Sequence, residues 1–411
     1  MEAKQPTTIG IISQYFYPDP SATGRLLTDL ATGLGTKGYA IVVYTGCPAF
    51  WQIKKRSEKK ESYQGITINR VFSTQLDTRK KPGQFLNAFS FTISVFFTIL
   101  FNKNIKLFFI VTNPPFLPFI GYLLKKIKKI EYITIVHDIE PNLSIVDGYL
   151  KQGWITDLWM KLNKLSYKNS SRITVLGRCM KETICEILPD YDPGKVEVIP
   201  NWEDETYIKP LLKEQNWFAQ QHNFLDKFVV LYSGNMSVHH DLDCIIEAAD
   251  LLRDKNIVFV FIGEGIKKET LKKKTQQLRL KNVLFLPFQP SEMFPYSITS
   301  GDVNIISQMK GSEGLCVSCK LYTALATGKP VIALIGKNSE ISKTLTESNC
   351  GFAVDTYNPI DLAKTVESLV ANERLTKQMG SNARTCFLES YTKNHAIDKY
   401  HNLVTEFKSP N

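Results

Sequence analysis

Short apolar runs alternate along the chain with segments whose apolar residues recur at helical spacing. Residues 8–13 form the first run and predict a strand, and Leu26, Leu30 and Leu34 belong to a helical pattern that ends near Gly35. Further strands are predicted at residues 40–44, 66–71 (at an edge of its sheet), 107–111, 132–136, 172–176, 196–200, 228–232, 258–262, 283–287, 303–306, 331–334 and 351–354. Helical patterns lie between most of these runs, including residues 85–101, 119–124, 150–167, 178–188, 242–252, 317–326 and 391–407.

This alternation predicts an α/β protein with two doubly wound, Rossmann-like domains facing each other across a cleft. Residues 203–225 have no strong period and carry Pro210, Asn216 and Asn223, so we place the boundary there. The expected domains are residues 1–205 and 206–390. Residues 391–411 are expected to form a C-terminal helix that packs back on the first domain.

Composition narrows the class of protein. The 411 residues are 43% hydrophobic and 22% charged, as in an ordinary globular enzyme of two domains. The net charge of +10 favours an anionic partner: a membrane surface, a nucleic acid or a phosphorylated substrate. Nucleic acid is the weakest of these, because the basic runs lack interleaved aromatic residues. The eight cysteines have no framework spacing, which indicates reduced cytosolic thiols, and the first residues lack the features of a signal peptide.

Residues 85–101 are almost all apolar and are followed by a lysine cluster at residues 125–129. The run is short for a spanning helix, which needs about 20 residues, and it contains Asn87. A buried or surface-inserting helix is therefore the preferred interpretation. Aromatic residues beside lysines predict in-plane attachment to an anionic membrane, so that the protein would be peripheral on the inner face of the cytoplasmic membrane. The alternative is a core helix followed by a solvated helix end.

Residues 311–333 predict a loop, a short helix and a strand. A helix N-terminus presents unpaired N–H groups and partial positive charge, which suit a diphosphate. Ser318 and Lys320 could donate to the same phosphates, and Glu313 could accept hydrogen bonds from sugar or ribose hydroxyls. Taken alone, however, the stretch is also compatible with an ordinary loop, helix and strand.

Two further positions carry candidate chemistry. His137 and Asp138 follow a buried strand, where α/β folds place their ligands, and His137 could exchange a proton near neutral pH. A single histidine is more often structural. Gly24 follows the first strand without a G-x-G-x-x-G fingerprint. It could let a phosphate or sugar approach the backbone, or it could serve the turn alone.

Taken together in order, the motifs FYPDPSATGR, TNPPF, IVHDIEPN, VIPNW, YSGNMS, FIGEG, LPFQP and SCKLYTALATGKPVIA resemble those of retaining glycosyltransferases of family 4. The likeness covers nearly the whole chain and is greatest to the bacterial branch that assembles cell-surface polysaccharides. It implies the GT-B fold and transfer of a hexosyl or N-acetylhexosaminyl group with retention of configuration. The second domain would hold a nucleotide-diphosphate-sugar donor and the first a lipid-linked or polysaccharide acceptor, with no cofactor and no active-site metal.

The resemblance also implies roles for individual residues. The catalytic group would be His137, Asp138 and Glu313. The residues expected to bind the donor are Gly24 and Arg25 at the diphosphate, Phe288 and Gln289 at the base, Ser318 and Lys320 in the diphosphate clamp, and Gly234, Asn235, His240, Gly263 and Leu321 around them.

The chain departs from the family pattern at four positions. Many members carry two glutamates eight positions apart; here the second position falls on Thr323, and Glu313 lies ten residues before it. Asn235 and His240 stand where many members have Arg and Lys. Two other functions stay open at this point: a GT-B nucleotide-sugar epimerase, and a non-catalytic subunit that binds a sugar nucleotide or a membrane.

Overall fold

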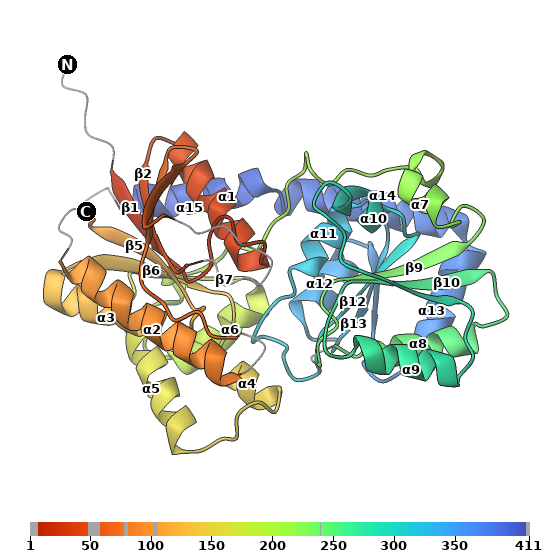
Figure 1. Cartoon of the computed structure of the whole chain (residues 1–411), viewed down its shortest axis with the longest axis horizontal. Coiled ribbons are helices and arrows are strands. Elements are labelled where there is room, and N and C mark those ends of the chain that lie inside the picture. Colours follow the sequence, from red (N-terminus) through yellow and green to blue (C-terminus); the bar gives the residue numbers. More distant parts are fainter. Residues whose placement is uncertain (1–6, 48–57, 78–80, 102–104, 239, 408–411) are drawn as a thin grey trace. The chain divides into compact units, whose positions relative to one another are not determined.

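Two compact units make up the computed structural model, which describes residues 7–47, 58–77, 81–101, 105–238 and 240–407 (Figure 1). Unit 1 comprises Met1–Pro200, Gly314–Cys316 and Asn394–Asn411, and unit 2 comprises Asn201–Glu313 and Val317–Lys393. The predicted pair of doubly wound α/β domains is confirmed. Unit 1 ends five residues before the expected boundary and also takes in a three-residue segment from the middle of the second half.

Unit 1 contains an eight-stranded sheet in the order β3-β4-β2-β1-β5-β6-β7-β8. Its strands are β1 (Thr8–Ile12), β2 (Ala40–Thr45), β3 (Lys60–Tyr63), β4 (Ile66–Arg70), β5 (Leu107–Val111), β6 (Glu131–Val136), β7 (Arg172–Val175) and β8 (Val196–Val198). All pair in parallel except β3, which is antiparallel to β4. The strand order changes direction between β1 and β5, the kind of position where doubly wound sheets bind ligands.

The predicted edge strand at residues 66–71 is not at the edge, because β3 covers it. The sequence of β3, KESY, has no apolar period, so local pattern could not reveal it. The central strand β5, LFFIV, is buried at every residue, as expected for a parallel sheet with helices on both faces.

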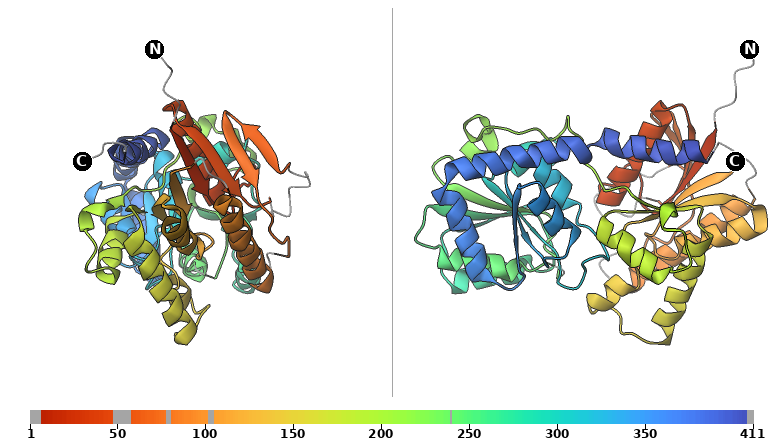
Figure 2. Two further views of the ribbon diagram at one scale, coloured as in Figure 1. Left: turned by 90° about the vertical axis from the view of Figure 1, so that its left-hand side faces the viewer. Right: turned by 180° about the vertical axis from the view of Figure 1, so that it is seen from behind.

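The helices of unit 1 are α1 (Ala22–Thr36), α2 (Lys81–Leu100), α3 (Leu117–Lys128), α4 (Asn142–Val146), α5 (Trp154–Asn169), α6 (Arg178–Ile187) and the 3-10 turn η1 (Pro193–Lys195), with α15 (Lys393–Glu406) added from the end of the chain. Helix α3 lies between α2 and α5 and packs against both (Figure 2). The short helix α4 was not predicted, and α5 begins four residues after the predicted start.

Helix α15 packs into the core of unit 1. The ring of Tyr400 meets that of Phe109 edge-on, with the ring centres 5.6 Å apart. A Cβ placed on Gly33 of α1 would lie 2.1 Å from Cδ1 of Ile397. The absence of a side chain at Gly33 therefore lets α15 approach α1 closely.

Unit 2 contains a six-stranded parallel sheet in the order β11-β10-β9-β12-β13-β14. Its strands are β9 (Phe228–Ser233), β10 (Ile257–Ile262), β11 (Val283–Leu286), β12 (Val303–Ser307), β13 (Val331–Leu334) and β14 (Gly351–Val354). Its helical elements are η2 (Lys213–Gln215), α7 (Trp217–Gln221), α8 (Leu242–Leu251), α9 (Lys268–Gln277), α10 (Phe294–Thr299), α11 (Lys320–Ala326), α12 (Glu340–Glu347), α13 (Pro359–Ala371) and α14 (Glu373–Ser390).

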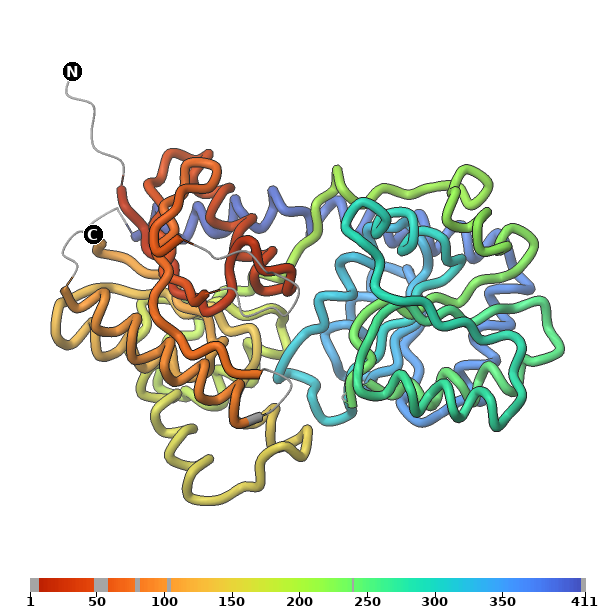
Figure 3. The backbone as a smooth tube through the Cα atoms, viewed as in Figure 1, coloured from red at the N-terminus to blue at the C-terminus, as the bar shows by residue number. Residues whose placement is uncertain are grey.

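The core of unit 2 is made by β9, β10 and β12 together with α8 and α13, whose facing residues are buried. The strand order changes direction between β9 and β12, and the backbone path through both strands can be followed in Figure 3. The carboxyl ends of β9 and its neighbours are therefore where a ligand of this unit is expected.

Candidate functional site

Glycines follow two neighbouring strands of unit 2 at their carboxyl ends. Gly234 follows β9, and Gly263 and Gly265 follow β10. Their φ angles are +146°, +144° and +150°, a region that residues with side chains rarely adopt. The N–H of Gly234 donates to Ile262 O at 2.9 Å and that of Gly263 to Leu286 O at 3.0 Å, so the ladder continues past the strand ends. The backbone is therefore bare of side chains at Gly234, Gly263 and Gly265.

Close packing also requires these glycines. A Cβ on Gly263 would lie 2.0 Å from Gly234 O, and one on Gly265 would lie 2.4 Å from Met236 O. A Cβ on Gly234 would lie 2.3 Å from Cε of Lys320. The alkyl chain of Lys320 therefore crosses directly over the glycine that ends β9.

Lys320 is the first residue of α11, and its amine points to His240. Nζ lies 3.1 Å from Nε2 of His240 and 5.7 Å from the centre of the Tyr232 ring. While Lys320 is protonated its ammonium group can only donate, so Nε2 of His240 is the acceptor in this contact. Burial lowers the pKa of Lys320 from its ordinary value, because the charged form loses hydration. An anion bound here would restore the favourable environment of the ammonium group.

An aromatic ring lies at the end of the third strand. Phe288 follows β11, is 53% exposed, and its Cε1 would be 3.4 Å from a Cβ on Gly263. Gln289 folds back, so that its Nε2 donates to Pro287 O at 2.9 Å. The exposed ring therefore stands beside the bare backbone and offers a flat apolar surface to a planar ligand.

The structure thus brings Gly234, His240, Gly263, Phe288 and Lys320 together, with Asn235 in the same turn, where its carbonyl accepts the hydroxyl of Tyr232 at 2.7 Å. The combination of a partly buried cation, bare backbone and an exposed ring suits a ligand with an anionic group and a planar ring. Sequence reasoning missed Tyr232 and Gly265; the repeated strand-then-glycine pattern of YSG and GEG could have indicated Gly265.

The helix predicted at residues 317–326 begins instead at Lys320 and has seven residues. Its N-cap, Cys319, is in the right-handed helical region and makes no side-chain cap. Ser318 lies before the helix, and its carbonyl accepts the N–H of Leu321 at 3.2 Å. The side chain of Leu321 is buried in the core. Only the backbone of Leu321 could therefore make the predicted contact with the sugar-nucleotide donor.

Glu313 lies apart from this cluster in the fold. Its Oε2 accepts the N–H of Gly311 at 2.6 Å, and its carboxyl group packs against Gly336, just beyond β13. In the sheet, β12 separates β13 from β9. The carboxylate of Glu313 therefore stabilises its own loop.

Thr323, at the sequence position where many family members carry a glutamate, binds the carboxylate of Glu203. Oγ1 of Thr323 donates to Oε2 of Glu203 at 2.8 Å, and both residues are buried. The backbone of Glu203 is held by Tyr391 and Lys393. Nothing local in the sequence could have revealed this pair, because 120 residues separate its members.

His137 directly follows β6 in unit 1 and is partly buried. Its backbone N–H donates to Oγ1 of Thr112 at 3.1 Å. Burial lowers the pKa of the imidazole to about 4, so the ring is neutral at neutral pH. Burial, followed by the charges of Glu140 and Asp147, raises the pKa of Asp138 to about 7. The chain therefore places a neutral imidazole next to a carboxyl group whose pKa lies close to neutral pH.

The loop after His137 is held by the segment Gly314–Cys316, which belongs to the same unit. The carbonyl of Leu315 accepts the N–H of Ile139 at 2.9 Å, and Cys316 forms an isolated antiparallel bridge with Asp138. The stretch predicted as one loop and helix is thus shared between the two units.

Gly24 does not sit at the turn between strand and helix. It lies inside α1, whose N-cap Ser21 accepts the N–H of Gly24 at 3.1 Å. A Cβ there would lie 2.7 Å from Asp19 O, so packing explains the glycine without a ligand. Arg25 follows it in α1. In the sheet, β5 separates β1 from β6, the strand that precedes His137.

Two other features bear on possible ligands. Among the described residues, no group of three or more His, Cys, Asp or Glu side chains could hold a metal ion. A pocket of about 160 Å³ adjoins His240, but its lining includes Asp241, Asp243 and Glu247 against one lysine, Lys267. This acidic lining does not suit an anion, so we do not assign the anionic ligand to this pocket.

Comparison with known proteins matches both halves of the chain to glycosyltransferases. The family model Glycosyltransferase Family 4 matches residues 23–206, and the model Glycosyl transferases group 1 matches residues 213–385. The probable glycosyltransferase WbjE of Pseudomonas aeruginosa is 25% identical over 290 residues, 70% of this chain and 72% of that protein. The putative colanic acid biosynthesis glycosyl transferase WcaI of Escherichia coli K12 is 25% identical over 372 residues, 87% of this chain and 89% of that protein.

Solved structures show the same fold at low sequence identity. Sucrose-phosphate synthase from Thermosynechococcus elongatus superposes with a TM-score of 0.78 at 15% identity, covering 98% of this chain and 99% of that one. Anabaena HepE in complex with UDP gives 0.75 at 14% identity, covering 97% and 100%. The two family models together span most of the chain and both describe glycosyltransferases, so the chain is a glycosyltransferase with the GT-B fold that is similar to family 4.

Proposed function

We propose that the protein transfers a hexosyl or N-acetylhexosaminyl group from a nucleoside-diphosphate sugar to a lipid-linked or polysaccharide acceptor, with retention of configuration. Unit 2 binds the donor and unit 1 the acceptor. Support comes from the relatives' names, one of which places WcaI in colanic acid biosynthesis, and from HepE, which has been solved with UDP and with UDP-glucose. We therefore propose that the transferred sugar becomes part of a polysaccharide.

The observation that carries this proposal is the cluster of Lys320, His240 and the glycine backbone beside Phe288. The nucleobase stacks on Phe288 and the diphosphate lies along Gly234 and Gly263. Lys320 then faces the oxygens that gain negative charge as the bond between sugar and phosphate breaks. Fixed donors and a partly buried cation stabilise this charge, so the proposed reaction uses no metal ion.

In the proposed mechanism the acceptor hydroxyl attacks the anomeric carbon of the sugar on the same face from which the diphosphate departs, so the anomeric configuration is retained. The departing phosphate takes the hydroxyl proton, so no nucleophile is required from the protein. His137 is neutral at neutral pH because burial lowers its pKa to about 4, and it can therefore accept a hydrogen bond from a sugar hydroxyl without carrying charge. We assign His137 and Asp138 to positioning the sugar and the acceptor.

The experiment is a thermal-shift screen with UDP-, GDP-, dTDP- and ADP-sugars, followed by NMR of the product. A bound donor stabilises the folded state by mass action, and the anomeric coupling of the new linkage reports retention or inversion. An inverted product would overturn the mechanism. Conversion of the donor to an isomer without any acceptor would indicate an epimerase instead, and binding without release of sugar would indicate a non-catalytic subunit.

A further inference from the structure

Helix α2 presents an apolar stripe to solvent. Phe85, Phe89, Ile93 and Phe97 recur every four residues and are each between 42% and 55% exposed. On the opposite face of the helix, Phe91, Val95 and Ile99 are buried, as are Asn87 and Thr92. One face of α2 therefore belongs to the core of unit 1, while the other is an exposed row of large side chains, mainly aromatic.

Asn87 explains why α2 lies along unit 1. Its Oδ1 accepts the N–H of Leu76 at 3.0 Å and the hydroxyl of Thr74 at 2.8 Å, and its Nδ2 donates to Leu76 O at 3.0 Å. By length and composition, Pro82–Leu100 could cross a membrane, and 33% of it is buried. Crossing a membrane would separate Asn87 and the buried face of α2 from these partners. The helix can therefore present its stripe to a membrane only while its axis lies along the membrane surface.

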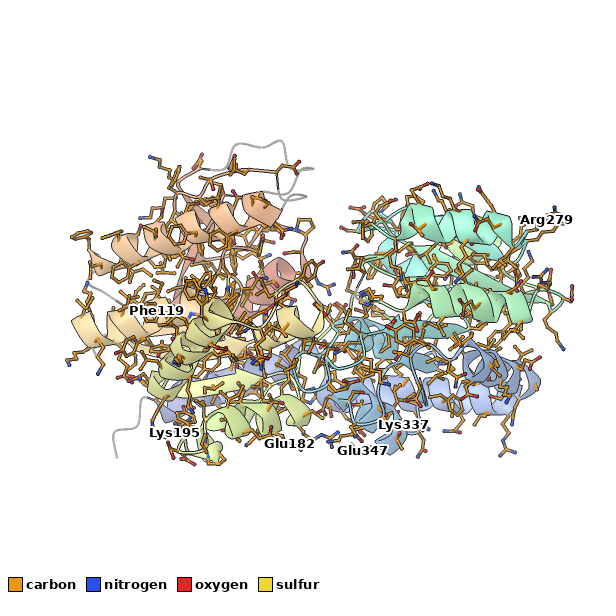
Figure 4. The ribbon with its side chains drawn as sticks, turned by 90° about the horizontal axis from the view of Figure 1, so that it is seen from below. Phe119, Glu182, Lys195, Arg279, Lys337 and Glu347 are labelled. Atoms are coloured by element: carbon orange, nitrogen blue, oxygen red, sulfur yellow. The ribbon has the colours of Figure 1, made fainter. Side chains whose placement is uncertain are left out.

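Positive charge lies at one end of the same stripe. Nζ of Lys128 donates to Leu100 O at 2.8 Å, which joins the lysine-rich end of α3 to the end of α2, next to Phe101. Lys125 pairs with Glu131 at 2.5 Å, while Lys126 lies 5.9 Å from the centre of the Tyr122 ring. The two helices contain no Asp or Glu. Figure 4 shows α2 and α3 running side by side, with Phe119 marking α3.

We propose that the α2 stripe and the lysines at the end of α3 form one surface that docks unit 1 on an anionic lipid bilayer. The rings of Phe85, Phe89 and Phe97 enter the boundary between headgroups and acyl chains, and Lys126 and Lys129 contact anionic headgroups. Charge of one sign beside a row of aromatic rings matches the two layers of such a bilayer. The negative potential of the cytoplasmic leaflet assigns the protein to the inner face of the membrane.

This surface is tested by flotation of the full-length protein with phosphatidylcholine vesicles, alone or mixed with phosphatidylglycerol. We expect binding to the mixed vesicles that weakens as salt is raised. Phe89→Ser and Phe97→Ser should each weaken binding about fivefold, because each removes a half-exposed ring from the lipid. Lys126→Gln and Lys129→Gln should each weaken it by about the same factor, with the salt dependence reduced.

Matched control variants lie in unit 2. Leu251 and Ile360 are 56% and 57% exposed, and Lys273 is an exposed lysine on α9. Leu251→Ser, Ile360→Ser and Lys273→Gln should leave vesicle binding unchanged. The thermal unfolding of every variant is measured alongside, so that loss of binding is read only from folded protein.

Three results would overturn the proposal: no binding to mixed vesicles, equal binding to neutral vesicles, or an equal loss in the unit 2 controls. A dimer in solution that Phe89→Ser dissociates, without vesicle binding, would show that the stripe is an interface between two copies. The vesicle assay needs neither donor nor acceptor. Its failure would therefore leave the proposed glycosyl transfer standing, and the failure of transfer would leave this surface standing.

Discussion

Replacing Lys320 by methionine tests the proposed diphosphate contact most directly. Methionine keeps an unbranched chain across Gly234 but removes the charge that lies 3.1 Å from His240. A hydrogen bond to a charged group contributes about 1.5–3 kcal/mol. We therefore expect the Kd for the nucleoside diphosphate, measured by calorimetry, to rise about 10- to 150-fold.

The pH dependence of binding distinguishes a charge effect from a change of shape. Burial lowers the pKa of Lys320, and a bound diphosphate favours its charged form. The contribution of Lys320 to nucleotide affinity should therefore be constant below the pKa that Lys320 has in the free protein. It should fall as the pH rises through that pKa, since binding then requires uptake of a proton. The Lys320→Met variant should lack this fall.

Lys329 provides the matched control. Burial also lowers the pKa of Lys329, but this residue precedes β13 and so lies at the opposite end of the strands from Gly234. Lys329→Met should leave nucleotide affinity unchanged. Wild-type affinity in Lys320→Met, or an equal loss in both variants, would refute the assignment of the diphosphate to Lys320.

Two further predictions concern stability. Gly33→Ala should lower the free energy of unfolding, measured in urea, by about 1–3 kcal/mol, because its Cβ would lie 2.1 Å from Ile397. In the Gly33→Ala background, Ile397→Ala should destabilise the protein less than it does in the wild type, because the smaller side chain relieves this clash. Gly35→Ala, with nothing within 4 Å of its Cβ, should stabilise the helix by about 0.5–1 kcal/mol, and a similar cost at both glycines would contradict this account. Because the pKa of Asp138 is raised to about 7, the folded state holds a proton that the unfolded chain releases between pH 4 and 7, so the carboxyl group destabilises the fold as the pH rises. Asp138→Asn should therefore stabilise the protein by about 2 kcal/mol at pH 8 and by little at pH 4, whereas equal effects at both pH values would refute the shift.

Strands that are buried on both faces could be predicted from the sequence, because their apolar runs are continuous. β5 and β13 have the predicted bounds, and β6 differs by one residue. The polar strand β3 could not be found, because it pairs through its backbone at the edge of the sheet and has no apolar period. The helix that begins at Lys320 was predicted three residues too early, because Val317 is apolar and buried in a loop rather than in a helix.

The candidate site was less accessible to sequence reasoning. The glycines after β9 and β10 could be named from their position after apolar runs. The contact of Lys320 with His240 joins residues 80 positions apart, and that of Thr323 with Glu203 joins residues 120 apart, so only the fold reveals them. The buried face of α2 could not be predicted either, because both faces are apolar and the polar residue Asn87 lies on the buried one, where Thr74 and Leu76 bind it.

The place of α15 has a consequence for how the protein is made. A ribosome delivers every strand of the first sheet long before it adds Ile397 and Tyr400, which close the core around Gly33 and Phe109. The nascent chain must therefore carry an incomplete N-terminal unit throughout translation of the second one. Loss of the last 18 residues by early termination or proteolysis would leave an apolar groove open to chaperones, although every residue assigned to donor binding would still be present.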